Sequence, residues 1–378
     1  MLAVRGLRWL SCGLAWLLVF TAAWAAADDP RPFGDGFPQL DSWAVGEWWA
    51  GPGATPDPEA SPAQRLPFRL DVPRNEVVAF AVYTVDVKPD GRPAVLKLTA
   101  QLFPLKPDEP REVRLELERE GRWEEVATAE VLYPGWDAHF RIDGWDATRA
   151  VPYRVRHGAE AVFEGIVRAD PIDHDAITVA VLSCNSSREP GERAELVAGL
   201  RAADPDLLFF SGDQTYRHTQ HTVGWIEFGL QFRDVLRDRP TVAIPDDHDV
   251  GHPNLWGEGG VRAAPDKNGA DGGYIYPAAY VNMVQRQQTW HLPDPVDPEP
   301  VAQGITVYFT RLVLGGVDFA ILEDRKFKTG PLGTIPRMGP RPDHILDPAY
   351  DRRAIDLPGL ELLGKRQLDW LARWAADW

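Results

Sequence analysis

The sequence predicts an α/β domain preceded by an all-β sandwich domain of the immunoglobulin or fibronectin type. Two patterns along the chain predict this order. Between about residues 70 and 170, apolar and polar residues alternate with a period of two, as they do over 113–118, which is typical of strands with one buried face. After Asp170-Pro171, apolar β-branched runs alternate with segments of helical periodicity, which is typical of a parallel sheet covered by helices.

The all-β region contains several short strands separated by turns, which is the spacing of a β-sandwich. We expect strands at 113–117, 123–127, 136–142, 153–156 and 161–167. The last two flank the His157-Gly158 turn, so they are expected to pair with each other.

The α/β region begins with a predicted β–α–β–α–β unit. Its strands are expected at 177–182, 206–210 and 241–244, and its helices at 190–203 and 223–236. We expect the first strand to be buried on both faces. In the first helix, the residues that share one face are Leu196, Val197, Leu200 and Ala203. Further along, we expect a helix within 274–288, strands at 305–309 and 317–322, and an amphipathic helix at 362–378 with Leu368, Leu371 and Trp374 on one side.

The first 27 residues have the three-part layout of a secretory signal peptide. Arg5 and Arg8 precede an uncharged run over 10–27 that ends in small residues of the A-x-A type, which is the arrangement of a cleavage site. The alternative is an uncleaved membrane anchor, because the run approaches the length of about 20 residues that a spanning helix needs. We expect cleavage and export to the periplasm or the exterior, with no membrane span in the mature chain.

The segment after the signal peptide, residues 28–65, is rich in Pro and Gly and also carries Trp43, Trp48 and Trp49. We expect an extended lead segment that its aromatic side chains fix to the rest of the protein. The predicted domains are then the β-sandwich over 66–172 and the α/β domain over 173–378.

The composition excludes several classes of protein. Of the 378 residues, 44% are hydrophobic and 25% are charged, and 15 are Trp, which is a globular rather than a disordered or disulfide-dense composition. The 40 basic and 56 acidic residues give a net charge of −16, which argues against a nucleic-acid-binding surface. Loss of Arg5 and Arg8 with the signal peptide leaves 38 basic residues against 56, a net charge of −18. A phosphate-bearing substrate would therefore need local positive charge from side chains or metal.

The two cysteines are Cys12 and Cys184. Cleavage of the signal peptide removes Cys12, so Cys184 has no partner for an internal disulfide. Cys184 is then a buried apolar residue, an intermolecular link or a thiolate in a functional site.

Polar side chains follow each of the three strands of the predicted parallel sheet. The strands end in Ser183-Cys184-Asn185, in the run over 211–216 that contains Asp213 and Tyr216, and in Asp246-Asp247-His248-Asp249. Taken alone, Cys184 is typical of a small buried residue and Gly212-Asp213 of a turn. Asp246-Asp247 beside His248 is typical of a helix cap or a solvated loop. Because ligands of open α/β sheets gather beyond the carboxyl ends of the strands, the three together predict a site. Two carboxylates in a small space resist ionisation without a cation, so we expect a metal site.

These three motifs resemble those of the PhoD-like alkaline phosphatases, a branch of the calcineurin-like metallophosphoesterases. The run over 322–325 resembles the family's LDxR strand, and the run over 363–371 resembles its LG-x-x-Q-x-x-WL helix. The resemblance covers about residues 40 to 378 and implies a calcineurin-like α/β domain after an N-terminal β-sandwich. Gly-Asp-x-x-Tyr also occurs in purple acid phosphatases, so this piece alone is not specific to the family.

The resemblance implies a two-metal site. Cys184 would supply a thiolate and Tyr216 a phenolate to a ferric ion, and Asp213 would bridge the two metals. The second metal of the family is calcium, which prefers oxygen ligands, and other divalent metals are possible. Asp247 takes the place of a ligand Asn in ordinary metallophosphoesterases.

The resemblance also implies residues that act on the substrate. His248 takes the place of the catalytic His, which would stabilise developing charge or protonate the leaving alkoxide. Asn185 and Arg325 are candidate phosphate contacts, and Arg325 is equally explained as a structural ion-pair partner.

Two features depart from the family pattern. Asn residues usually follow the Asp-Asp-His motif, whereas here the chain continues as Val250-Gly251-His252-Pro253-Asn254. Either His252 or Asn254 would serve as the metal ligand, or neither does. The family's later Gly-Asp-x-His motif has no counterpart in the sequence, so we expect that the α/β domain is incomplete at its C-terminus.

The sequence therefore predicts an exported, metal-dependent phosphoesterase that hydrolyses phosphomonoesters, phosphodiesters or both. The alternative is a non-catalytic exported surface protein that binds glycans through its Trp-rich segment and carries a degenerate phosphatase domain. A third interpretation, a hydrolase with Cys184 as nucleophile, requires an activating His nearby.

Overall fold

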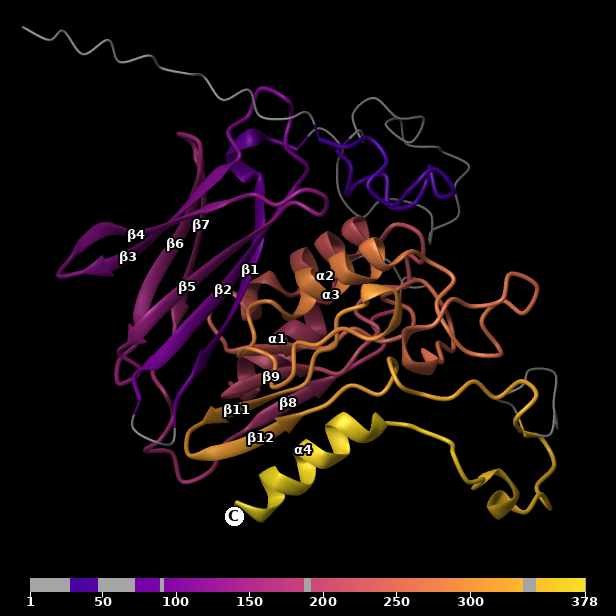
Figure 1. Ribbon diagram of the computed structural model, residues 1–378. Helices are drawn as coiled ribbons and strands as arrows, with labels where there is room; N and C mark the ends of the chain where they lie inside the picture. The colour runs from indigo at the N-terminus through magenta and orange to yellow at the C-terminus, as the bar shows by residue number, and fades with distance from the viewer. Residues whose placement is uncertain (1–27, 47–71, 89–91, 187–191, 336–344, 378) are drawn as a thin grey trace, which may run out of the picture. The chain divides into compact units, whose positions relative to one another are not determined.

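The computed structural model describes residues 28–46, 72–88, 92–186, 192–335 and 345–377, and the predicted signal peptide lies outside these ranges. Its first seven strands form two antiparallel sheets, with the orders β1-β2-β5 and β4-β3-β6-β7 (Figure 1). The strands are β1 (Val78–Asp86), β2 (Ala94–Leu102), β3 (Glu112–Arg119), β4 (Arg122–Glu130), β5 (Asp137–Trp145), β6 (Val151–His157) and β7 (Ala161–Val167).

The two antiparallel sheets pack on a common core. β6 and β7 pair across the predicted turn, and along both strands buried and more exposed residues alternate, which confirms the period of two. Tyr83 of β1 meets Tyr153 of β6 edge-on at 6.3 Å between ring centroids, and both rings are fully buried. Because these strands belong to different sheets, the contact closes the sandwich.

The second region contains the predicted parallel sheet. β8 (Val179–Leu182), β9 (Leu207–Phe210) and β10 (Thr241–Ala243) run parallel in the order β10-β9-β8. α1 (Ala194–Ala203) connects the first two strands and α2 (His221–Leu236) connects the last two. The remaining elements are α3 (Ala278–Thr289), β11 (Thr310–Leu314), β12 (Val317–Ile321), α4 (Gly364–Ala376) and the short 3-10 helices η1 (Arg74–Glu76), η2 (Glu258–Gly260), η3 (Ala302–Gly304) and η4 (Arg352–Ile355).

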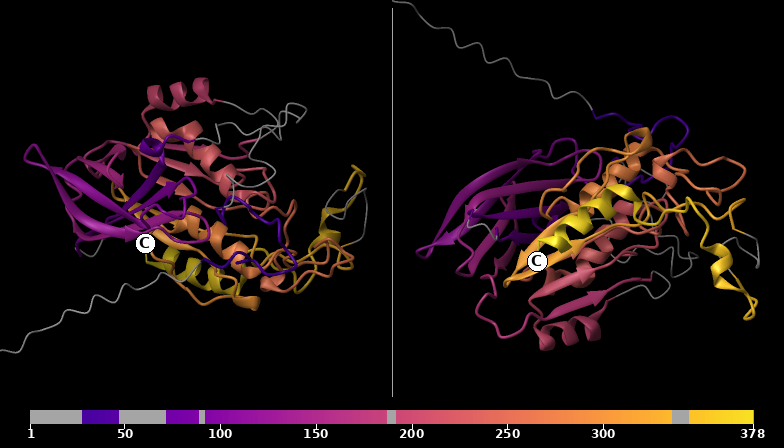
Figure 2. Two further views of the ribbon diagram at one scale, coloured as in Figure 1. Left: turned by 90° about the horizontal axis from the view of Figure 1, so that it is seen from above. Right: turned by 60° about the horizontal axis from the view of Figure 1, so that its bottom comes forward.

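The last helix packs on the β11–β12 hairpin (Figure 2). Trp374 of α4 donates from Nε1 to Asp318 of β12 at 3.0 Å. Gln367, fully buried, accepts a hydrogen bond from the backbone N–H of Glu323 just after β12. No helix in the described part of the chain is long and apolar enough to cross a bilayer.

The structure corrects three expectations about burial and secondary structure. β8 is not buried on both faces, because it ends its sheet and Val181 is 67% exposed. The run 305–309 is not a strand; β11 begins at Thr310, although most of the run is buried. The apolar faces assigned to two helices are also partly wrong, because Leu196 and Leu368 are exposed.

The β-sandwich and the α/β region share one hydrophobic core. Phe80 of β1 packs against Trp225 of α2, with 5.4 Å between ring centroids. Gly229, one turn further along α2, allows this approach, because a Cβ there would lie 2.0 Å from the Phe80 ring. The chain from Arg31 onward forms one compact unit, and the domain limits at 66–172 and 173–378 stay predictions.

Residues 31–46 of the lead segment are fixed to the start of α2. The Asp41 carboxylate accepts the backbone N–H and the hydroxyl of Thr222, with its Oδ2 at 3.0 and 2.9 Å. Trp43 is buried, and its carbonyl accepts a hydrogen bond from the indole of Trp136. The expectation that aromatic residues hold this segment is thus met at Trp43, while Trp48 and Trp49 lie outside the described residues.

The contact between α2 and β1 predicts opposite effects for two helical glycines. Gly229→Ala should lower the free energy of unfolding by about 1–3 kcal/mol, because the new methyl group overpacks the Phe80 contact. Gly199→Ala in α1 meets nothing within 4 Å and should raise it by about 0.5–1 kcal/mol through helix propensity. Urea unfolding of the two variants measures the change in the free energy of unfolding. Equal changes in both variants would contradict the close contact between Gly229 and Phe80.

The burial of Asp41 predicts a pH dependence of stability. Desolvation, opposed by hydrogen bonds from Thr222 and Ala44, raises the pKa of Asp41 from 3.8 to about 7. The folded protein therefore binds the proton more tightly than the unfolded chain, and this contribution to stability is lost as the pH rises through about 7. In Asp41→Asn, the free energy of unfolding should fall less between about pH 5 and pH 8. Asp35→Asn, at an exposed carboxylate, should keep the pH dependence of the parent. The same pH dependence in Asp41→Asn would refute the raised pKa of Asp41.

Candidate metal centre

The site lies beyond the carboxyl ends of β9 and β10. Gly212 and Asp213 both have positive φ angles, +119° and +60°, and turn the chain sharply after β9. A side chain at Gly212 would lie 2.4 Å from Cβ of Asp246, so glycine lets the two loops touch. This close approach places Asp213 beside Asp247 and His248.

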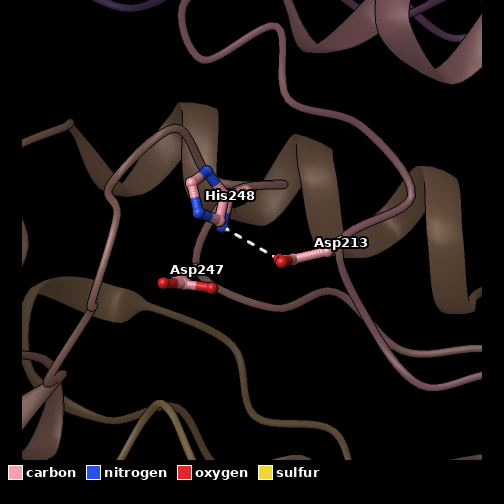
Figure 3. Close-up of side chains that lie close together, drawn as sticks. All are labelled: Asp213, Asp247 and His248. Carbon is pink, nitrogen blue, oxygen red and sulfur yellow. Dashed lines mark hydrogen bonds between the residues drawn. The ribbon is translucent and has the colours of Figure 1, made fainter. Parts of the chain in front are cut away.

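Asp213, Asp247 and His248 form the centre of the site (Figure 3). Each offers one ligand atom, and these atoms all lie within 4.8 Å of one another. The backbone N–H of His248 donates to Oδ1 of Asp213 at 3.3 Å, which links the β9 loop to the β10 loop. Both aspartates are buried.

Cys184 and Tyr216 face the same carboxylate oxygen of Asp213. The Tyr216 hydroxyl donates to Oδ2 at 2.7 Å, and Sγ of Cys184 lies 3.6 Å from the same atom. Cys184 is exposed and is held to the β9 loop by its backbone N–H, which donates to Gly212 at 3.2 Å. Of the five residues predicted from the sequence, three therefore form the central group, and Cys184 and Tyr216 lie beside one of them, Asp213.

Among the described residues, acidic side chains outnumber basic ones at this point. Burial, and then the carboxylates of Asp247 and Asp246, raise the pKa of Asp213. Burial also opposes ionisation of Asp247, but the charge of Arg325 and the backbone N–H of Asn254 hold its pKa below the usual range. Carboxylate oxygens, a phenol and a thiol around a site short of positive charge are a donor set that fits metal cations.

The two predicted phosphate contacts are engaged with protein groups. Arg325 pairs with both carboxylate oxygens of Asp246, and its Nη2 lies 3.5 Å from Oδ1 of Asp247. Asn185 donates from Nδ2 to the side chain of Gln231 at 2.8 Å and accepts from Arg193. These contacts agree with the structural ion-pair role for Arg325 that the sequence left open.

His252 is not part of the central group. Its Nε2 lies 3.2 Å from the carbonyl oxygen of Asn268, and its Nδ1 is buried without a hydrogen-bond partner in the described part of the chain. Burial lowers the pKa of His252, which favours the neutral, ligand-competent ring. The backbone N–H of Asn254 contacts Asp247.

Asp249 is a supporting residue that the sequence analysis did not assign. Its buried carboxylate accepts three backbone N–H groups, from Asp213 at 2.8 Å, Thr215 at 3.1 Å and Asp246 at 2.9 Å. Burial raises its pKa to about 7. The residue belongs to the Asp246-Asp247-His248-Asp249 motif, but nothing in the sequence shows that it joins the β9 and β10 loops.

A structural comparison finds similar solved structures, whereas no protein-family model and no curated protein matches the sequence. The structure of PhoD aligns with a TM-score of 0.54 at 17% identity, over 78% of this chain and 59% of that one. The structure of purple acid phosphatase PPD1 from yellow lupin (Lupinus luteus) seeds aligns with a TM-score of 0.40 at 14% identity, over 64% of this chain and 44% of that one.

The chain thus shares a fold with PhoD over 78% of its length, and the predicted resemblance is confirmed at the level of the fold. The chain spans 59% of the length of the PhoD chain that it matches.

The three hydrogen bonds to Asp249 predict that it positions the candidate metal ligands Asp213 and Asp247. Asp249→Asn should lower metal affinity by about 10–100-fold, the usual cost of losing a residue that orients a ligand, because an amide cannot accept all three N–H groups. Metal titration followed by calorimetry measures the change.

Asp206→Asn is the matched control for Asp249→Asn. The Asp206 carboxylate also accepts a backbone N–H, from Thr178 at 2.8 Å, but just before β9, at the opposite end of the strand. The control should keep parental metal affinity. Equal losses in both variants would show a general effect on the sheet and contradict the positioning role.

Proposed function

We propose that this protein is an exported, metal-dependent phosphoesterase that hydrolyses phosphomonoesters, phosphodiesters or both. The observation that carries the proposal is the convergence of Asp213, Asp247 and His248 within 4.8 Å in a PhoD-like fold. Cys184 and Tyr216 beside Asp213 extend the donor set. The fold alone does not define the chemistry, so the proposal depends on the residues.

The proposed metals are a ferric ion and a calcium ion, or other divalent metals in their place. Cys184, Tyr216 and Asp213 would hold the iron. Asp213 and Asp247 would hold the second cation, with His252 as a further candidate. Cations bound there would supply the positive charge that draws in a phosphate ester and stabilises its transition state. Burial, Cys184 and Asp213 raise the pKa of Tyr216, so its phenolate form requires such a cation.

The protein's own groups have separate roles in the proposal. His248 acts on the leaving oxygen or stabilises charge there. Arg325 holds Asp246 and approaches Asp247, which keeps the β10 loop in place despite its negative charge. Asn185 lines the cavity of about 600 Å³ beside Cys184 and Asp213, where a phosphate oxygen would be within its reach after a change of partner.

The two other interpretations have less support. The glycan-binding alternative relied on an exposed Trp-rich segment, but Trp43 is buried and hydrogen-bonded. A Cys184 nucleophile requires a nearby imidazole, whereas in the described part of the chain the thiol of Cys184 contacts the carboxylate of Asp213.

The proposal predicts metal-dependent hydrolysis of p-nitrophenyl phosphate or bis-p-nitrophenyl phosphate. A chelator should abolish the activity and added metal should restore it. Asp213→Asn should lower kcat by at least about 100-fold, because the metals contribute several kcal/mol to transition-state stabilisation. Asp206→Asn should retain parental activity. Hydrolysis that is indifferent to both the chelator and Asp213→Asn would refute the proposal, and a Tyr-to-ferric charge-transfer band would support the iron site.

A further inference from the structure

His218 lies directly against His248. Its Nε2 is 2.6 Å from Nδ1 of His248, and the two rings are tilted by 31° with 4.8 Å between centroids. His218 stands on the loop between Tyr216 and α2, so the pair joins the β9 loop to the β10 loop at the side chain that is proposed to act on the substrate.

The backbone on both sides holds this pair in place. The carbonyl of His218 accepts the hydroxyl of Tyr280 at 3.3 Å. Gly251 has φ +72°, and a Cβ there would lie 1.8 Å from the same carbonyl oxygen, so the β10 loop reaches His218 only because residue 251 has no side chain. The N–H of Gly251 donates to the carbonyl of His248 at 3.0 Å. The imidazole contact is therefore anchored from each end.

The contact fixes which nitrogen of His248 is left free. A hydrogen bond between two imidazoles needs one N–H donor and one bare nitrogen. If Nε2–H of His218 donates to Nδ1 of His248, a neutral His248 carries its proton on Nε2, because the bond to one ring nitrogen sets the state of the other.

We propose that His218 is a positioning residue for His248: it binds Nδ1 and so presents Nε2–H to the leaving oxygen of a phosphate ester. This inference rests on the proposed phosphoesterase function. In the hydrolysis, the oxygen of water bonds to phosphorus and the ester P–O bond breaks with its electron pair on the leaving oxygen. Nε2–H donates to that oxygen, and the proton released by the water balances the reaction.

The role predicts a dependence on the leaving group. An oxygen that leaves as a weakly acidic phenol needs help from a donor, whereas p-nitrophenol leaves easily without it. His218→Met should lower kcat for phenyl phosphate by at least about 10-fold and kcat for p-nitrophenyl phosphate much less, with KM unchanged for both. His218→Gln, whose amide nitrogen reaches the position of Nε2, should stay within about threefold of the parent.

Controls separate this role from a structural one. His174→Met, at an exposed histidine paired with Asp206, should leave both substrates unaffected. Equal losses on both substrates in His218→Met, or loss of bound metal, would show that His218 only supports the loop. Unchanged rates in His218→Met would also overturn the proposal.

A second measurement does not depend on activity. Nitrogen-15 NMR of the imidazole rings, assigned through His248→Asn, should show His248 with a bare Nδ1 and a protonated Nε2 in the parent and in His218→Gln, and a different tautomer balance in His218→Met. If the parent with metals hydrolyses neither ester, the proposed function fails. The NMR result still shows whether Nδ1 of His248 accepts a hydrogen bond from His218. A protonated Nδ1 on neutral His248 in the parent would overturn the inference.

Discussion

Crowded negative charge at the carboxyl ends of β9 and β10 is the constraint on which this structure depends. Asp213, Asp246, Asp247 and Asp249 belong to two loops that touch through Gly212. Three of these carboxylates have raised pKa values, with burial as the largest cause. Within the described residues the local compensation comes from one guanidinium, Arg325, and from backbone N–H groups. Such an arrangement is costly without a cation.

The rest of the fold supports these loops from behind. Gln214, which follows Asp213 in the β9 loop, donates to Gln288 of α3 at 3.0 Å. The adjacent Gln287 donates to the carbonyl of Gly135 in the β-sandwich region at 2.9 Å. Two consecutive residues of one helix therefore connect the site to the sandwich. Buried polar contacts of this kind specify a geometry more strictly than apolar packing does.

Sequence patterns predicted most of the strands and helices. They also predicted that five site residues lie at the same edge of the sheet, because the carboxyl ends of parallel strands meet there. They did not predict that β8 is exposed, because an apolar run looks the same whether or not a neighbour covers it, as Val181 shows. They also missed Asp249 and His218. Each acts through a partner about 30 residues or more away, a relation that no local spacing contains.

The terminal position of β8 has a consequence for the symmetry of the site. In the described part of the chain β8 pairs with β9 alone. The backbone N–H groups of Cys184 and Asn185 donate to the carbonyls of Gly212 and Asp213, so the position of Cys184 depends on the β9 loop. Asp247, in contrast, is held by Arg325 and by the backbone N–H of Asn254, and the next residue, His248, donates to Asp213 of the β9 loop. The two sides of the site are therefore fixed by different parts of the chain: the thiol side by the β9 loop and, through Asn185, by Gln231 of α2, and the carboxylate side by the segments around Asn254 and Arg325.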